Sequence, residues 1–194
     1  SLANMVHLEV SAHIPLPIEE YWRLRITSEF LATESKVLKN ASKTISKTEH
    51  DDEGRVIYHQ MKTKPDLSAV PSVLMAMLPE EGIVYVDDIE YVTDDEQTPY
   101  VCRTRTTPNI AQDSCNITSY MRVIQDPTDA NACIQTLTLD VSVSLWMAGS
   151  AVENLIANGV RDGYKKLPQI VQTYLATLHV TDERSSTPLS VGSV

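Results

Sequence analysis

The stretch CIQTLTLDVSVSLW, from Cys133 to Trp146, decides the fold of this chain. Its residues alternate strictly between two sides. One side carries Leu137, Leu139, Val141, Val143 and Leu145, and the other carries Thr136, Thr138, Asp140, Ser142 and Ser144. A repeat of two residues is typical of a strand with one buried face and one solvated face. The stretch therefore predicts a long strand.

After Gly149 the apolar repeat changes to three and four residues. The residues that follow it are Val152, Leu155, Ile156, Gly159, Val160, Gly163, Leu167, Ile170, Val171, Tyr174 and Leu178. This spacing predicts an amphipathic helix of about 28 residues. A helix of that length needs an equally long apolar surface, which the dry face of a curved antiparallel sheet would offer. Pro168 predicts a kink in the helix.

The remaining sequence predicts strands, short helices and tight turns. The expected strands cover residues 7–14, 41–48, 55–63, 83–92, 100–107 and 114–125. A short helix is expected to begin near Pro17, Ser28 is expected to cap a second one at residues 29–38, and an apolar helical turn covers 71–78. The segments between the strands are short, which favours sequential antiparallel pairing.

This order of elements, with the junction from Ser142 to Gly149, resembles the helix-grip fold of the START-related superfamily. That superfamily includes lipid-transfer proteins, birch-pollen-allergen-like proteins and polyketide cyclases. The resemblance covers residues 5–178 and implies an α+β fold, with a seven-stranded curved antiparallel sheet wrapped around a long C-terminal helix. We expect residues 1–4 to be an expression scar and residues 179–194 to be a flexible tail or a truncated linker.

Charge and composition limit the classes of partner. The net charge of −10 disfavours nucleic acid and anionic membranes, so we expect at most transient membrane contact. Eight carboxylates and no Lys or Arg lie between Glu80 and Glu96. Such a run is typical of a solvated strand face, and the alternative is a docking surface for a basic protein partner. The odd count of three cysteines favours a reduced, cytoplasmic protein. We also expect the protein to be a monomer.

Motifs for catalysis and for metal binding are missing from the sequence. The five histidines have no ligand-type spacing, and no GxSxG, CxxC or phosphate-binding glycine loop occurs, so we expect no metal and no cofactor. His59, Arg103, Arg105 and Tyr164 are the titratable residues that a cyclase or hydratase could use. Arg103 and Arg105 share one strand face. They either point inward to bind an anion or point outward opposite Asp88 and Glu90.

We interpret the chain as a non-catalytic carrier of an apolar small molecule, such as a lipid, sterol or fatty acid, in a cavity between the sheet and the final helix. The resemblance implies a lid at residues 69–78, and the alternative is that this Met- and Leu-rich segment simply fills the core. The expected cavity lining is Leu74, Met75 and Leu78 from the lid, Arg103, Met121, Leu139, Val141 and Val143 from the sheet, and Ile156, Gly159 and Gly163 from the helix. The two glycines indicate either close approach of the sheet backbone or space for a ligand. The alternatives are a cyclase- or hydratase-type enzyme and a protein-interaction module with a closed core.

Overall fold

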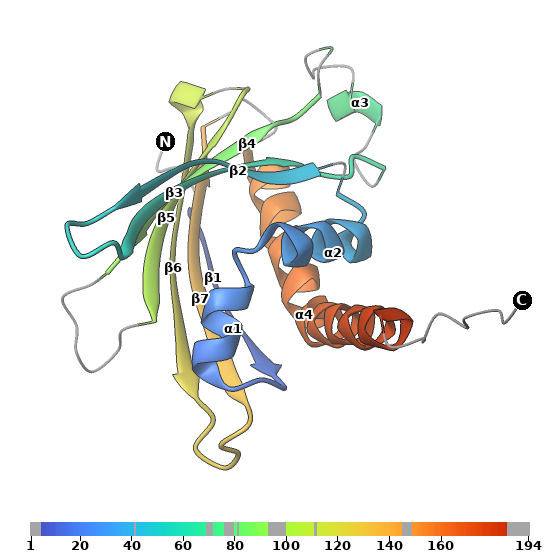
Figure 1. Cartoon of the computed structure of the whole chain (residues 1–194). Helices are drawn as coiled ribbons and strands as arrows, with labels where there is room; N and C mark the ends of the chain where they lie inside the picture. Colours follow the sequence, from blue (N-terminus) through green and yellow to red (C-terminus); the bar gives the residue numbers. More distant parts are fainter. Residues whose placement is uncertain are drawn as a thin grey trace, which may run out of the picture.

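A curved antiparallel sheet and a long helix form the body of the protein in this computed structural model (Figure 1). The structure describes residues 5–40, 42–68, 72–75, 80, 82–92, 100–110, 112–144 and 149–185. The side chains at 73, 74 and 179–185 are outside the description.

The elements follow the predicted order. They are β1 (Met5–Ile14), α1 (Ile18–Leu24), α2 (Ser28–Leu38), β2 (Ser42–His50), β3 (Val56–Lys64), α3 (Ser72–Met75), β4 (Tyr85–Tyr91), β5 (Val101–Pro108), the 3-10 turn η1 (Gln112–Ser114), β6 (Cys115–Gln125), β7 (Cys133–Val143) and α4 (Gly149–Ser185). The predicted long strand and long helix are thus confirmed as β7 and α4.

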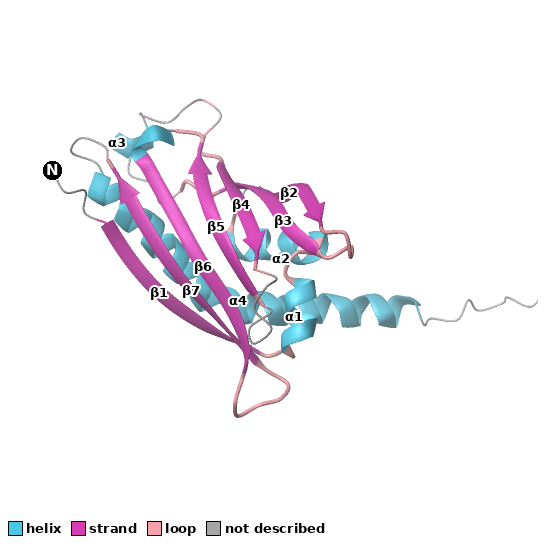
Figure 2. Ribbon diagram, turned by 90° about the vertical axis from the view of Figure 1, so that its left-hand side faces the viewer, coloured by secondary structure: helices cyan, strands magenta, loops and turns pink. Residues whose placement is uncertain are grey.

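The seven strands form one sheet in the order β1-β7-β6-β5-β4-β3-β2, with every neighbouring pair antiparallel. The first and last strands of the chain are neighbours, and Leu8 stands opposite Leu139. The helices lie on one side of the sheet, which curves around α4 (Figure 2). This arrangement is the α+β helix-grip architecture that the sequence predicted.

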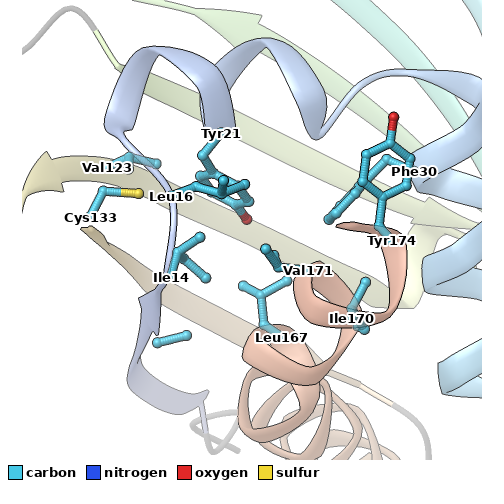
Figure 3. Packing of buried hydrophobic residues seen from close by; sticks show 11 residues of the cluster. Ile14, Leu16, Tyr21, Phe30, Val123, Cys133, Leu167, Ile170, Val171 and Tyr174 are labelled. Atoms are coloured by element: carbon cyan, nitrogen blue, oxygen red, sulfur yellow. The ribbon is translucent and has the colours of Figure 1, made fainter. Parts of the chain in front are cut away.

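Helix α4 packs on β1 and β7 and also contacts α2. Its N-terminal half covers a hydrophobic cluster that includes Leu8, Val141 and Ala157. Its C-terminal half covers a second cluster, in which Tyr21 of α1 and Val171 of α4 lie close together (Figure 3). The first cluster buries branched aliphatic side chains and the second buries aromatic ones as well, so burial of apolar area fixes the helix along these two strands.

The junction between β7 and α4 depends on two residues. Gly149 lies so close to β7 that an added Cβ would be 2.2 Å from the carbonyl oxygen of Val143. Glu153, only 2% exposed, accepts a hydrogen bond from the backbone N–H of Val143 at 2.8 Å. The glycine permits the close approach, and the carboxylate satisfies a buried donor at the end of the strand.

Two element ends differ from the expectation. Thr27, not Ser28, caps α2: its backbone is extended and its hydroxyl oxygen accepts the N–H of Phe30 at 3.3 Å, whereas Ser28 is already helical. Helix α4 continues to Ser185, seven residues beyond Leu178, because no glycine or proline interrupts this segment. Pro168 lies inside α4, and the helix changes direction partway along its length (Figure 1).

Candidate functional site

The concave face of the sheet is only partly covered. Because α4 packs on β1 and β7, it lies over one side of the sheet, and several inward-facing side chains of the other strands keep partial exposure. These half-buried residues are Thr63, Tyr85, Asp87, Thr104, Thr106 and Ser119. They share their face with the buried residues Met61, Ile89 and Met121, as the strand register shows.

Arg25 brings a cation to this side of the sheet. It caps the C-terminus of α1, and its guanidinium carbon lies 3.9 Å from the centre of the Trp22 ring and 5.4 Å from that of Tyr91. Its Nε and Nη2 atoms are buried and have no hydrogen-bond partner among the described residues. No described carboxylate forms an ion pair with it.

Two more polar groups with free hydrogen-bonding capacity lie beside Arg25. His59, 3% exposed, has its ring 5.5 Å from the Tyr91 ring in an edge-on arrangement. Its Nδ1 shares a hydrogen bond of 2.9 Å with the Thr48 hydroxyl. Within the described part of the chain, neither His59 Nε2 nor the Tyr91 hydroxyl makes a hydrogen bond of normal geometry, although both atoms are buried and Tyr91 lies near enough to Arg25 for each to shift the pKa of the other. Buried polar atoms are normally paired, so these unpaired atoms indicate a ligand site.

The groups around Arg25 do not neutralise its charge at neutral pH. Burial raises the pKa of the Tyr91 phenol and that of the Cys102 thiol, although Arg25 opposes both shifts. Burial also lowers the pKa of His59. The Lys47 carbonyl opposes this shift, and the positive charge of Arg25 adds to it. All three side chains are therefore uncharged at pH 7. We call Trp22, Arg25, His59, Tyr91 and Cys102 the Arg25 cluster.

A second polar group of residues lies on the same face. The Thr106 hydroxyl donates to the Asp87 carboxylate at 2.5 Å, and burial raises the pKa of that carboxyl. Lys43 and Glu34 form an ion pair of 2.7 Å nearby, and both affect the pKa of Asp87. A carboxyl with a raised pKa on a concave surface is a candidate for acid–base chemistry.

A chain of hydrogen bonds ties α1, β7 and α4 together. The Tyr21 hydroxyl donates to Gln135 Oε1, and Gln135 Nε2 donates to the Tyr164 hydroxyl, both at 2.8 Å. Burial raises the pKa of both tyrosines well above the ordinary value. These side chains are neutral and hold the helices against the sheet next to the site.

A depression of about 420 Å³ opens between α2 and β2. Its lining comes from Ile26, Ser28, Leu31, Ala32, Lys43, Thr44 and Ile45. Leu31 and Ile45 also belong to the hydrophobic cluster against which Trp22 and Tyr91 pack. The depression therefore adjoins the Arg25 cluster.

The sheet and helix residues that were expected to line the cavity lie mainly in packed regions. Leu139, Val141 and Val143 are buried and pack with Ile156 beneath α4. Met121 is buried beside Cys102 in the cluster that reaches the Arg25 cluster. These five residues therefore lie on the inward side of the sheet. All of them except Met121 are packed in the hydrophobic cluster beneath α4.

Arg103 lies on the opposite face of the sheet, which corrects its expected place in the cavity lining. Side chains alternate along β5, and Cys102 and Thr104 take the inward positions. Arg103 and Arg105 are exposed and stand opposite Glu90 and Asp88, the outward alternative considered from the sequence. Arg103 contributes to a depression of about 270 Å³ on this outer face.

The helix glycines do not mark a close approach of the sheet. An added Cβ at Gly159 or Gly163 would have no described neighbour within 4 Å. Gly159 is exposed and Gly163 is half-buried. This geometry favours open space over backbone contact, and Gly163 is the residue of the two nearer the interior.

The expected lid and the acidic region are described only in part. Residues 72–75 form α3, where Met75 is 42% exposed, while the Leu74 side chain and all of Leu78 lie outside the described residues. In the acidic region Asp87 points inward and Asp88 outward, where it accepts hydrogen bonds from Tyr58 and Gln60. Residues 93–99 are outside the description.

In the part of the chain that the structure describes, no group of three His, Cys, Asp or Glu residues is placed to hold a metal ion. No helix there has the length and apolar character that a membrane crossing requires.

Comparison with known proteins gives one family and a set of similar folds. The profile of a family described as "Protein of unknown function (DUF2505)" matches residues 9–175. No protein with a curated description matches the sequence.

Three solved structures illustrate the likeness in fold. A START superfamily protein from Mycobacterium smegmatis is 13% identical, with a TM-score of 0.57, covering 86% of this chain and 97% of its own. The Zhui aromatase/cyclase from Streptomyces sp. R1128 is 13% identical, with a TM-score of 0.58, covering 98% and 100%. A norcoclaurine synthase point mutant from Thalictrum flavum, in complex with a transition-state analogue, is 13% identical, with a TM-score of 0.55, covering 91% and 98%. These likenesses show that the chain shares the helix-grip fold with these three proteins.

Proposed function

Because the chain belongs to the DUF2505 family and has the helix-grip fold of the START-related superfamily, we propose that it binds or transfers an apolar small molecule without catalysis. The ligand lies on the concave side of the sheet, between the middle strands and α4. Residues 5–178 form the ligand-binding domain, and residues 69–78, with Leu74, Met75 and Leu78, act as its lid.

The observation that supports this proposal is that side chains on the concave face of the sheet, which faces the helices, are partly exposed instead of fully buried. Met61, Ile89 and Met121 give the surface apolar character, while Thr104 and Ser119 between them stay half-buried. A concave surface that combines apolar side chains with polar groups is a usual form of a small-molecule site. A ligand there would remove apolar area from water.

Native mass spectrometry of the purified chain, followed by extraction with organic solvent, tests the proposal. We expect an apolar molecule bound one-to-one, or uptake of an added one. The variant Thr104→Trp should block uptake, because its larger side chain fills the concave side. Thr118→Trp is the matched control: it is the same substitution at a half-buried threonine on the outer face. Equal uptake by both variants contradicts the proposed place of the ligand.

A cyclase- or hydratase-type enzyme is the second candidate, and one observation favours it. Asp87 is held on the concave side with a raised pKa, and His59 is buried with a free ring nitrogen. A general acid and a general base need such groups near the substrate. Conversion of a bound molecule by the wild-type chain, lost in Asp87→Asn, would establish this function instead.

A further inference from the structure

We propose that the ligand is an amphipathic carboxylic acid and that Arg25 is the residue that binds its carboxylate. This inference rests on the proposed function and specifies the class of ligand. The acidic end of the ligand lies in the Arg25 cluster, and its apolar chain extends over the half-buried inward face of the sheet.

Arg25 carries a buried positive charge that no described side chain neutralises. The guanidinium of Arg25 stays protonated under all ordinary conditions, and its Nε and Nη2 are buried. Its described neighbours Tyr91, Cys102 and His59 are neutral at pH 7, and the nearby carboxylate of Glu34 is paired with Lys43. The Trp22 ring, at 3.9 Å, offsets part of the cost of burying this cation. A ring face supplies no counter-ion, so the charge requires an anion from outside the described residues.

The unpaired donors of Arg25, Nε and Nη2, have the geometry that a carboxylate requires. Nε and Nη2 lie on one edge of the guanidinium, and this edge donates two parallel hydrogen bonds to a carboxylate. The Trp22 ring lies against the flat face of the group and leaves that edge available. A single carboxylate neutralises a single guanidinium, whereas a dianionic phosphate would leave a buried negative charge.

Two more polar groups without a hydrogen bond of normal geometry, the Tyr91 hydroxyl and His59 Nε2, lie beside Arg25. The Tyr91 hydroxyl can donate to a carboxylate oxygen, and His59 Nε2 can donate when the proton lies on that nitrogen. Its Nδ1 then accepts from the Thr48 hydroxyl, an arrangement that the 2.9 Å contact allows. One ligand group would satisfy all of these buried atoms at once.

The experiment compares acids with alcohols of the same chain length. Octanoic, dodecanoic and hexadecanoic acids and the matching primary alcohols are titrated into the full, delipidated chain by calorimetry at neutral pH. We expect at least one acid to bind about tenfold or more tightly than its alcohol, since the carboxylate accepts charge-assisted hydrogen bonds that the alcohol cannot form. Arg25→Met should abolish that preference, and Arg25→Lys should keep only part of it.

Arg23→Met is the matched control, because Arg23 is exposed on the same helix and its Nε donates a hydrogen bond to the backbone carbonyl of Glu19. It should keep the full preference for acids. Equal binding of acid and alcohol by the wild-type chain, or a preference that survives Arg25→Met, overturns the inference and leaves the proposed function intact. Binding of neither series contradicts both.

Discussion

The guanidinium of Arg25 lies against the ring of Trp22, with its central carbon 3.9 Å from the ring centre. Arg25 follows Trp22 by about one turn, at the C-terminal end of helix α1. Both residues face Tyr91 of β4, which contacts each of them. An arginine three residues after a tryptophan lies on the same helix face. The pair therefore brings a charged group into a region that is otherwise aromatic and apolar.

Arg25→Met should stabilise the ligand-free protein. Methionine fills a similar volume without a charge, so the variant loses the contact with Trp22 but also loses an uncompensated buried cation. We expect the free energy of unfolding, measured with urea, to rise by about 1–2 kcal/mol. Arg23→Met should change it by less than about 0.5 kcal/mol. A less stable Arg25→Met variant would show that the arginine is structurally satisfied.

His59 should make stability sensitive to mild acid. Its pKa in the folded protein is below the ordinary 6.5, mainly because of burial, so the unfolded chain binds a proton first as pH falls. Stability is therefore lost from about pH 6.5 downward, until the folded pKa is reached. The difference in unfolding free energy between wild type and His59→Gln, measured across this range, should change in that window. A constant difference would mean that the His59 pKa is not lowered.

Asp87 should have the opposite effect. Burial raises its folded pKa above the ordinary 3.8, so the folded protein holds this proton at pH values where the unfolded chain has lost it. The contribution of Asp87 then becomes less favourable as pH rises from about 3.8 through the folded pKa. Asp87→Asn, which keeps a partner for Thr106, should be more stable than wild type at pH 7 but not at pH 3. A variant less stable at pH 7 would contradict the raised pKa.

Gly149 and Gly163 should respond differently to the same substitution. Gly149→Ala places a Cβ against the Val143 carbonyl, and we expect a loss of about 1–3 kcal/mol in unfolding free energy. Gly163→Ala meets no described atom within 4 Å, so its better helix propensity should add about 1 kcal/mol. Thermal unfolding of both variants measures this contrast. Similar effects at the two positions would contradict the close approach at the junction.

The architecture could be predicted because its signals are local. The strict alternation in 133–143 and the three-and-four spacing after Gly149 each reflect burial of one face, so the residues themselves carry the period. The exact ends of the elements could not be predicted in the same way. Thr27 and Ser28 can both cap a helix, and only the backbone conformation distinguishes them. The polar segment after Leu178 lacks an apolar period, yet its residues are compatible with a helix.

Only His59 of the Arg25 cluster was a candidate from the sequence. The cluster itself could not be predicted, because its members come from the end of α1 and from β3, β4 and β5. In the sequence, Arg25 resembles any basic residue near the C-terminus of a helix, where such residues are common. Asp87 was likewise grouped with the other carboxylates of the acidic region. Only the strand register separates it from Asp88, since neighbouring residues in a strand point to opposite faces.

Quenching of Trp22 fluorescence by brominated dodecanoic acids tests the central claim most directly. With Trp146 replaced by Phe, Trp22 is the remaining one of the two tryptophans. Alpha-bromododecanoic acid carries its bromine beside the carboxylate, and omega-bromododecanoic acid carries it at the far end. If the carboxylate binds Arg25 and the chain extends along the sheet, the alpha isomer quenches Trp22 at saturation much more strongly than the omega isomer. Equal quenching by the two isomers, or no saturable binding of either, contradicts the account.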